Sequence, residues 1–464
     1  MEKESVRIRF EGKTLTCRPG TTVAVALWEN GIRTLSHSPK YGHPRGLTCA
    51  RGQCTSCLMR VDGEPNVRTC ELAVRDGMDI RRQDTGAFYG PLLQKTLATG
   101  HRFFPVGFYY KWFTRPPFVS RMFLRSIRPL TGVGRLPDAV AAPFPEPEDL
   151  GSFETVVIGA GPSGLEAAVE ATGSVLLLDE NSRPGGQRAP ALDHVAAAGE
   201  LDGFPVLAAA HARLEQARRG LDNRPEIRFA GDTRAIAGYR PDGLLLRTGN
   251  RLLTVRCGSL IWAAGALDTL GLFPGNDTPG LLGPRALYRL LLRDGLDLTS
   301  SRVLVVGEGL DFWLSATLLA GVGVRPTLVL TTGDGHDEVA SAVQRKWPLH
   351  TGLVLGHIKP TGETSLAVSF TPRGAHDHAP LSHLDMETDL VVICNRGKPA
   401  YDIPHQLGRS LALDPDRGGF LPTGAGAGSL RGVLPDGMLL DVRGEAGGCP
   451  AEATLFRNTE ADAP

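Results

Sequence analysis

The sequence has no long apolar run and no excess of charge of either sign. None of its hydrophobic stretches approaches the roughly 20 residues that cross a bilayer, and the opening MEKESVRIRF lacks the apolar segment of a secretory signal. Lysine and arginine total 50, as do aspartate and glutamate, so nucleic acid is not expected as a partner. We therefore expect a cytoplasmic protein without a transmembrane segment.

Patterns typical of hydrolysis or of disulfide exchange are also missing. No paired carboxylates or Ser/His arrangement stands out, and the 12 histidines are scattered. No redox pair of cysteines follows Gln187, which argues against a disulfide oxidoreductase. Eight cysteines in 464 residues do not make a disulfide framework. The grouping of four of these cysteines is more informative than their number.

Residues 154–187 carry the strongest local pattern of the chain. A β-branched run is followed by a glycine-rich turn, a helix of small residues and a second apolar run. Such a turn lets the backbone approach a pyrophosphate, and the helix N-terminus offers N–H groups to the phosphates. The turn residues that we expect at the cofactor are Gly159, Gly161, Pro162, Ser163 and Gly164. The alternative is a Rossmann scaffold that has lost its ligand.

An acidic residue closes the second apolar run, where a ribose-binding acid is expected. Asp179 stands 20 positions after Gly159 and is the better candidate, with Glu180 as the neighbour that could take its place. Gly186 and Gln187 follow and would let the chain run beside the cofactor. Further along, Ala264 and Gly265 lie in a small-residue turn after a buried strand, where a dinucleotide could rest against the backbone.

Four cysteines lie in one loop near the N-terminus. Cys49, Cys54 and Cys57 have the spacing C-x4-C-x2-C, and Cys70 follows after 12 residues. Plant-type [2Fe–2S] proteins open with this spacing, because one wrapped loop and one later thiolate can enclose two irons. A zinc site would more often show two C-x2-C pairs. Zinc and four unrelated buried thiols are the alternatives.

Glycines and arginines flank these cysteines. Gly46 and Gly52 suit a loop that turns its N–H groups toward sulfur. Arg45, Arg51 and Arg60 would favour anionic thiolates. The same stretch follows a hairpin signal at residues 6–17.

The connector at residues 91–150 is basic and aromatic. Its segment HRFFPVGFYYKWFTRPPFVSRMFLRSIRPL holds nine aromatic residues and no acid. It either wraps over the flanking domains or forms a subunit interface.

A second βαβ pattern, at residues 302–331, is incomplete. Gly307 and Gly309 match the first two glycines of the motif, but Phe312 occupies the third position. The second strand ends in Thr331 and Thr332, with no acid for a ribose. This pattern favours a structural lobe over a nicotinamide nucleotide site.

The order of these motifs resembles a known family. The cysteine loop, FYYKWFTRP, GAGPSGLEAA and DE…PGGQ are similar to the alpha subunits of heteromeric sarcosine oxidase. They also resemble the related subunits of hydrogen cyanide synthase, opine oxidase and dye-linked proline or hydroxyproline dehydrogenases. The resemblance implies an alpha subunit with a dinucleotide and an iron–sulfur centre. A separate flavoprotein beta subunit of amino-acid-oxidase type, and further small subunits in some complexes, would accompany it.

The closing motif departs from this family pattern. The stretch at residues 437–444 holds Asp441, which would meet the flavin, but the aspartate is displaced and Arg443 intrudes. The resemblance implies FAD as the dinucleotide, and this departure is the reason that ATP or NAD at the same site are the alternatives.

The expected fold is α/β, with a β-grasp ferredoxin-like domain before a two-dinucleotide-domain flavoprotein of the glutathione reductase type. We place the iron–sulfur domain at 1–90, the connector at 91–150, the FAD-type domain at 151–285 and 370–464, and an inserted degenerate NAD-type domain at 286–369. The expected function is electron transfer in a heteromeric amino-acid or amine dehydrogenase or oxidase. A non-catalytic nucleotide-binding subunit and a self-contained NAD(P)H-dependent flavin reductase are the alternatives.

Overall fold

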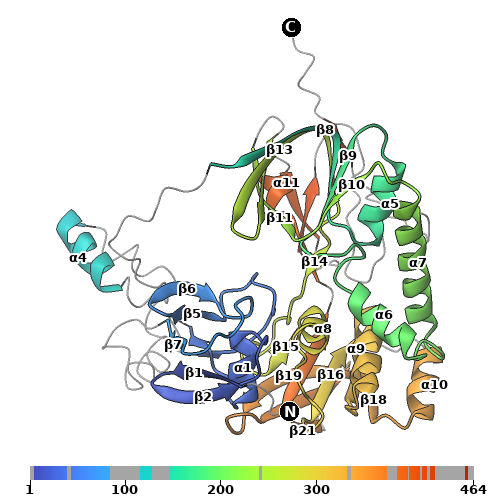
Figure 1. Cartoon of the computed structure of the whole chain (residues 1–464). Coiled ribbons are helices and arrows are strands. Elements are labelled where there is room, and N and C mark those ends of the chain that lie inside the picture. The colour runs from blue at the N-terminus through green and yellow to red at the C-terminus, as the bar shows by residue number, and fades with distance from the viewer. Residues whose placement is uncertain are drawn as a thin grey trace.

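Three bodies, a ferredoxin-like domain and two α/β lobes, make up the fold in the computed structural model (Figure 1). The structure describes residues 5–38, 43–83, 115–127, 146–239, 243–331, 336–373, 384–395, 397–407, 410–414, 419–423 and 455–457. Within these ranges no helix is long and apolar enough to cross a membrane.

The N-terminal body is a five-stranded sheet with one helix across it. The strand order is β2-β1-β7-β5-β6, and β1 pairs in parallel with β7 and antiparallel with β2. The expected hairpin at Glu11-Gly12 is confirmed, since both residues have positive φ in the turn between β1 and β2. The elements are β1 Val6–Phe10, β2 Lys13–Cys17, α1 Val23–Glu29, β3 Ser36–His37, β4 Pro44–Arg45, β5 Leu58–Val61, β6 Glu64–Arg68 and β7 Asp79–Arg82.

The first lobe has a mixed sheet with the order β10-β9-β8-β13-β12-β11. Its β10, β9, β8 and β13 run parallel, and β26 adds to β13. Helices α5 to α7 lie along one side of this lobe (Figure 1). The elements are β8 Glu148–Ile158, α5 Pro162–Glu170, β9 Val175–Leu178, α6 Ala189–Ala197, α7 Pro205–Asp222, β10 Arg228–Ala230, β11 Thr233–Tyr239, β12 Gly243–Thr248, β13 Arg251–Trp262 and β26 Leu455–Arg457.

A second, all-parallel sheet forms the other lobe, with the order β15-β22-β16-β17-β18. Its strands span residues 281–394, on both sides of the 286–369 range expected for the inserted domain. Every residue of β16 and β22 is buried, as expected for parallel strands covered on both faces. The elements are β15 Leu281–Leu282, α8 Pro284–Leu292, β16 Val303–Gly307, α9 Gly309–Gly321, β17 Thr327–Leu330, α10 His336–Gln344, β18 Leu349–Thr351 and β22 Leu390–Cys394.

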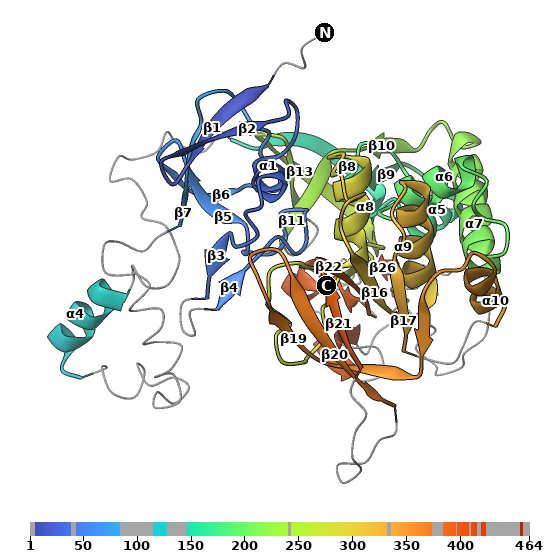
Figure 2. The same ribbon diagram turned by 90° about the horizontal axis from the view of Figure 1, so that it is seen from below.

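An antiparallel layer of β19, β20 and β21 covers the outer face of this second sheet (Figure 2). Short pieces connect the lobes, and α4 stands clear of the other elements in Figures 1 and 2. The remaining elements are α4 Pro117–Ile127, β14 Ala266–Leu267, β19 Leu353–Pro360, β20 Leu366–Pro372, β21 Leu384–Thr388, β23 Lys398–Pro399, α11 Asp402–Gln406, β24 Ser410–Asp414 and β25 Gly419–Thr423.

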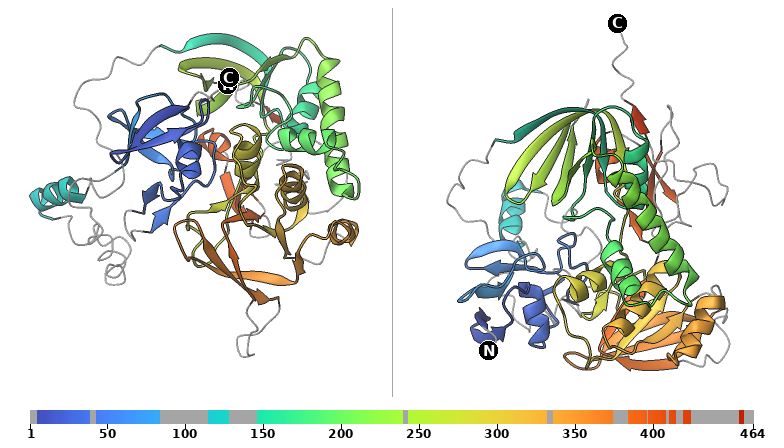
Figure 3. Two further views of the ribbon diagram at one scale, coloured as in Figure 1. Left: turned by 60° about the horizontal axis from the view of Figure 1, so that its bottom comes forward. Right: turned by 45° about the vertical axis from the view of Figure 1, so that its right-hand side comes forward.

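The ferredoxin-like domain docks on the second lobe beside α8 (Figure 3, left). Arg293, at the end of α8, donates to the carbonyl of Cys70 over 3.2 Å, and Arg18 donates to the carbonyl of Gly295 over 2.9 Å. Gly46 lies so close to Pro279 that an added Cβ would stand 2.8 Å from the Pro279 Cα atom. The cysteine loop is thus fixed against the rest of the chain.

A buried ion-pair network joins the two lobes. Arg188, just before α6, donates twice to the Asp311 carboxylate on α9, with both distances 2.7 Å. Arg285 on α8 lies 3.6 Å from the same carboxylate and also pairs with Asp268. Burial alone would raise the pKa of Asp311, yet Arg188 and Arg285 hold it below its usual value. A charged Asp311 therefore locks the first lobe to α9.

We predict that Asp311→Asn lowers the free energy of unfolding by about 3–5 kcal/mol, because it leaves buried arginines without their counter-charge. Urea unfolding followed by tryptophan fluorescence measures this loss, since Trp313 lies beside Asp311 on α9. The matched control is Glu148→Gln, which removes an exposed ion pair with Arg251 and should cost less than about 1 kcal/mol. Equal effects in the two variants would contradict the role of the network.

Candidate functional site

The four cysteines of the N-terminal loop come together at one point. Their thiols contact one another in the pairs Cys49–Cys54, Cys49–Cys70 and Cys57–Cys70. The backbone N–H of Gly52 donates to Cys70 Sγ over 3.2 Å, and that of Cys54 donates to Cys49 Sγ over 3.3 Å. The expectation that Gly52 turns its N–H toward sulfur is confirmed.

The electrostatics of these thiols fit a metal cluster. Contacts with the Cys54 and Cys70 thiols, helped by backbone N–H groups, hold the pKa of Cys49 well below its ordinary value. The contact with Cys49 in turn raises the pKa of Cys54, and contacts with Cys49 and Cys57 raise that of Cys70. Four adjacent thiols cannot all ionise without cations between them, and iron supplies that charge when the ligands lose their protons.

The glycine-rich turn between β8 and α5 is built for close backbone approach. A Cβ on Gly164 would stand 1.7 Å from the Gly159 oxygen, and one on Gly159 would stand 2.2 Å from the Ala263 oxygen. Gly186 faces Gly161 in the same way, with 2.9 Å from its added Cβ to the Gly161 Cα atom. Only glycine satisfies these positions, so the turn is held tightly against the β13–β14 turn.

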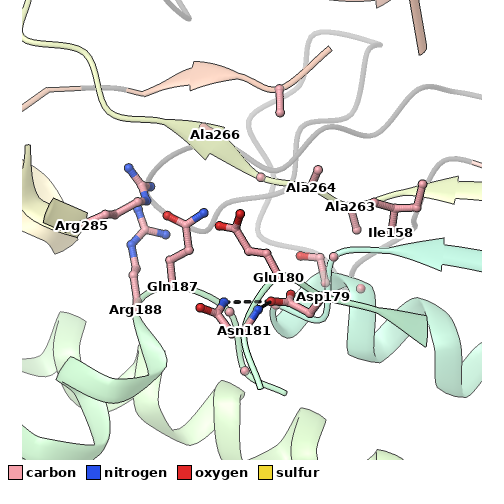
Figure 4. Close-up of a pocket in the computed structure, with 18 of the residues that line it drawn as sticks. Ile158, Asp179, Glu180, Asn181, Gln187, Arg188, Ala263, Ala264, Ala266 and Arg285 are labelled. Atoms are coloured by element: carbon pink, nitrogen blue, oxygen red, sulfur yellow. Dashed lines mark hydrogen bonds between the residues drawn. The ribbon is translucent and has the colours of Figure 1, made fainter. Parts of the chain in front are cut away.

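The two acids at the end of β9 have different surroundings. The Asp179 carboxylate accepts from the backbone N–H of Ala160 and of Asn181, over 2.7 and 2.8 Å, and from the Asn181 side chain. Burial raises the pKa of Asp179 despite these donors. Glu180 instead turns its carboxylate toward Gln187 and the β13–β14 turn (Figure 4). The structure thus gives Asp179 a role in shaping the turn and presents Glu180 to the open space.

A cavity of about 670 Å³ lies in front of this turn. Its size suits a nucleotide cofactor. Eleven of the residues expected at the cofactor line it, namely Gly159, Gly161, Pro162, Ser163, Gly164, Asp179, Glu180, Gly186, Gln187, Ala264 and Gly265. The twelfth, Asp441, lies outside the described residues. Residues more than 100 positions apart in the sequence therefore meet at one cavity.

The cavity is also lined by arginines that the sequence motifs did not predict. Arg213 on α7 donates twice to Glu166 over 2.8 Å and once to Ser163 Oγ over 3.1 Å, at the N-terminus of α5. Arg234 on β11 lies 3.0 Å from Glu180. Arg188 and Arg285 point into the same space (Figure 4). No local pattern marks these residues, because each comes from a different element.

The Arg51 side chain does not lie where the sequence analysis placed it. The sequence favoured a role for its charge beside the thiolates, but its guanidinium donates to Gln187 Oε1 and Glu180 Oε1 instead. Its side chain is 5% exposed and forms part of the cavity wall, together with Gly52 and Gln53. The cysteine loop and the dinucleotide turn therefore share one cavity.

The second lobe has the shape of a Rossmann unit without its open phosphate turn. Gly307 repeats the role of Gly159, since an added Cβ would stand 2.1 Å from the Cys394 oxygen. Phe312 is fully buried where the third glycine would be and packs edge-on against Trp313 at 4.8 Å. Asp311 places a buried negative charge in the first turn of α9, where a phosphate would need N–H groups.

Only residues 115–127 of the connector are described within 84–145. They form α4, on which Phe118 is 69% exposed and Met122 63%. Because α4 stands clear of both flanking domains, this part of the connector does not wrap over them (Figures 1 and 2).

Comparison with known proteins begins with the N-terminal domain. Residues 3–85 match the family described as the 2Fe-2S iron-sulfur cluster binding domain. The prediction of a [2Fe–2S] domain at this end of the chain is confirmed.

Sequence relatives extend this result. The chain is 28% identical over 317 residues to the alpha subunit of sarcosine oxidase from Rhizobium meliloti, which covers 62% of this chain and 30% of that protein. It is 30% identical over 83 residues to the HcnA subunit of hydrogen cyanide synthase from Pseudomonas aeruginosa, covering 18% of this chain and 79% of HcnA. The chain belongs to the family of these subunits, which also includes a subunit of opine oxidase from Agrobacterium tumefaciens. This sarcosine oxidase family is the one that the sequence motifs resemble.

A solved structure supports the fold of this chain. The crystal structure of L-proline dehydrogenase from P. horikoshii matches with a TM-score of 0.56 at 18% identity, covering 92% of this chain and 66% of that one. The predicted α/β fold class is confirmed. The chain spans less than half the length of the sarcosine oxidase alpha subunits that it matches, at 30% and 44%.

We predict that Cys54→Ser removes the iron and the broad visible absorption of the purified protein, because a serine hydroxyl is a poor ligand for a thiolate-bound cluster. Iron content per chain and the absorption spectrum, both measured without air, check this. Cys17→Ser is the matched control, since Cys17 is a buried cysteine of the same domain outside the loop. Iron near zero in the unaltered protein would refute the cluster.

Proposed function

We propose that this chain is the electron-transfer subunit of a heteromeric dehydrogenase or oxidase that acts on the CH–NH or CH–NH2 group of an amino acid or amine. The substrate is oxidised on a partner flavoprotein subunit of amino-acid-oxidase type, and further small subunits can join the complex. Sarcosine, proline and opines are the substrate classes that the names of the relatives suggest, and the family resemblance adds hydroxyproline and glycine.

One observation carries the proposal, which is the cavity shared by the cysteine loop and the dinucleotide turn. Gly52 donates its N–H to Cys70 Sγ and also lines the cavity. A redox group held by these cysteines is therefore one residue away from the wall of the nucleotide site. This proximity supports electron exchange between the two sites, and a chain that only binds nucleotide does not require it.

The proposed cofactors are a [2Fe–2S] cluster and FAD. Cys49, Cys54, Cys57 and Cys70 would hold the cluster, and the N–H groups of Gly52 and Cys54 would stabilise its sulfurs. Such a cluster passes single electrons, whereas a flavin exchanges one or two. The glycine-rich turn would cradle the pyrophosphate, with Glu180 or Asp179 at the ribose.

The exposed face of α4 supports a partner subunit. Phe118 and Met122 are large apolar side chains exposed on this helix, and Arg121 lies between them in sequence. Aromatic residues, methionine and arginine are enriched at protein interfaces. We therefore propose α4 as part of the contact with the flavoprotein subunit.

A second candidate function is a non-catalytic subunit that binds ATP or NAD. Arg443 beside Asp441 in the closing stretch favours it, because an arginine there does not suit the usual flavin contact. The shared wall between loop and cavity weighs against it. Acid release of the bound nucleotide, followed by chromatography, separates the two, since FAD supports the first and ATP or NAD the second.

We predict that the complex with its flavoprotein partner reduces an artificial dye with an amino acid, and that Cys57→Ser lowers this rate at least tenfold. The reason is that the electrons would lose their exit through the cluster, while the partner's own flavin is still reduced by the substrate. Steady-state dye reduction and anaerobic bleaching of the flavin measure the two steps separately.

Cys17→Ser in the same complex is the control and should keep the full rate. The chain purified alone should oxidise no amino acid. Substantial turnover by the single chain, or an unchanged rate with Cys57→Ser, would overturn the electron-transfer role.

A further inference from the structure

Arg51 contacts both redox sites with different parts of one residue. Its backbone N–H faces the Cys49 thiol. Its guanidinium donates to Glu180 and to Gln187 at the end of the dinucleotide turn. The residue lies in the four-residue interval between Cys49 and Cys54, so its guanidinium is carried by the same loop as these two cysteines.

The other side of Glu180 is tied to the same loop. Arg234 lies 3.0 Å from Glu180 Oε2 and 3.5 Å from Glu71 Oε1, and Glu71 follows Cys70. Gly52 has φ +69°, and an added Cβ would stand 2.2 Å from the Glu71 carboxylate. The loop thus closes a ring from Cys49 through Arg51, Glu180, Arg234 and Glu71 back to Cys70.

Because the Arg51–Glu180 pair of this ring is buried, its stability depends strongly on the pair staying in contact. The Arg51 and Glu180 side chains are 5% and 17% exposed. Burial alone would raise the pKa of Glu180, but Arg51 and Arg234 together hold it below its ordinary value. Breaking a buried pair leaves an uncompensated charge, whereas an exposed pair contributes little.

The Arg51 side chain also forms part of the cavity wall. Its guanidinium holds Glu180 and Gln187, which line the same cavity. It is therefore suited to orient these two side chains toward a nucleotide.

We propose that Arg51 is a positioning residue that couples the two sites, so that a loop ordered by the cluster strengthens nucleotide binding and a bound nucleotide protects the cluster. The proposal rests on the proposed function, because it needs a nucleotide in the cavity and a cluster on the cysteines. Coupling between two binding sites is reciprocal, so the effect on each has the same size.

The test measures nucleotide affinity with and without the cluster. FAD and ATP are each titrated into the full chain in two states, one loaded with the cluster and one stripped of iron by a chelator under argon. We expect removal of the cluster to weaken binding of the resident nucleotide about tenfold, which lies within the usual range of such coupling. Reciprocally, that nucleotide should slow the loss of iron to the chelator.

Arg51→Met should weaken nucleotide binding and should also abolish the dependence of the nucleotide affinity on the cluster. Its nucleotide affinity should be weak and equal in the two states, and its rate of iron loss should be the same with and without nucleotide. Arg51→Lys, which keeps the charge but not the two-pronged donor, should restore part of the coupling. Arg9→Met is the matched control, because Arg9 is an exposed arginine of the same domain, and it should leave the tenfold ratio intact.

The outcomes separate this inference from the proposed function. If the unaltered chain binds the nucleotide equally in both states, or if Arg51→Met keeps the tenfold ratio, the coupling role is wrong while the proposed function stands. If neither FAD nor ATP binds, or if the chain holds no iron, both fail. Should Arg51→Met fail to fold, Arg234→Met tests the same ring from the other side of Glu180 and should also reduce the ratio.

Discussion

The contact between Arg51 and Glu180 is the interaction on which the arrangement of this molecule depends. It joins a small ferredoxin-like domain, which alone would bury little surface, to the edge of a Rossmann sheet. Without it, the cysteine loop and the dinucleotide turn would be two sites on one chain. With it, they form the two walls of one cavity. The docking of Arg293 on the Cys70 carbonyl secures the same loop from the side of the second lobe.

The two lobes share a core of parallel strands but differ in front of the glycine-rich turn. In the first lobe, glycines bring backbone against backbone and leave space in front of the turn. In the second lobe, Phe312 and Trp313 fill the corresponding region, and Asp311 directs its charge into a network with Arg188 and Arg285. The second lobe has thereby become a support that fixes Arg188 and Arg285 at the rim of the cavity.

The sequence predicted those parts of the site that local geometry imposes. The glycine spacing of 159–164 and the cysteine spacing of 49–57 are each dictated within one turn or loop, so they could be recognised without the fold. The arginines could not, because Arg51, Arg213 and Arg234 meet only after the chain has folded. The expectation that Arg51 serves the thiolates was wrong for its guanidinium for the same reason, since Glu180 stands 129 positions away. The expected range of the inserted lobe, 286–369, leaves out β15 and β22 of its sheet. β15 is only two residues long and β22 lies far along the chain, and neither carries a glycine motif that the sequence analysis could recognise.

The most direct measurement is electron paramagnetic resonance of the complex with its flavoprotein partner, frozen after anaerobic addition of the amino acid substrate. Our account predicts that the signal of a reduced [2Fe–2S] cluster develops with the same substrate dependence as bleaching of the partner's flavin. A cluster that stays oxidised and silent while that flavin is fully reduced would contradict the account, because electrons would then bypass the loop that carries Arg51.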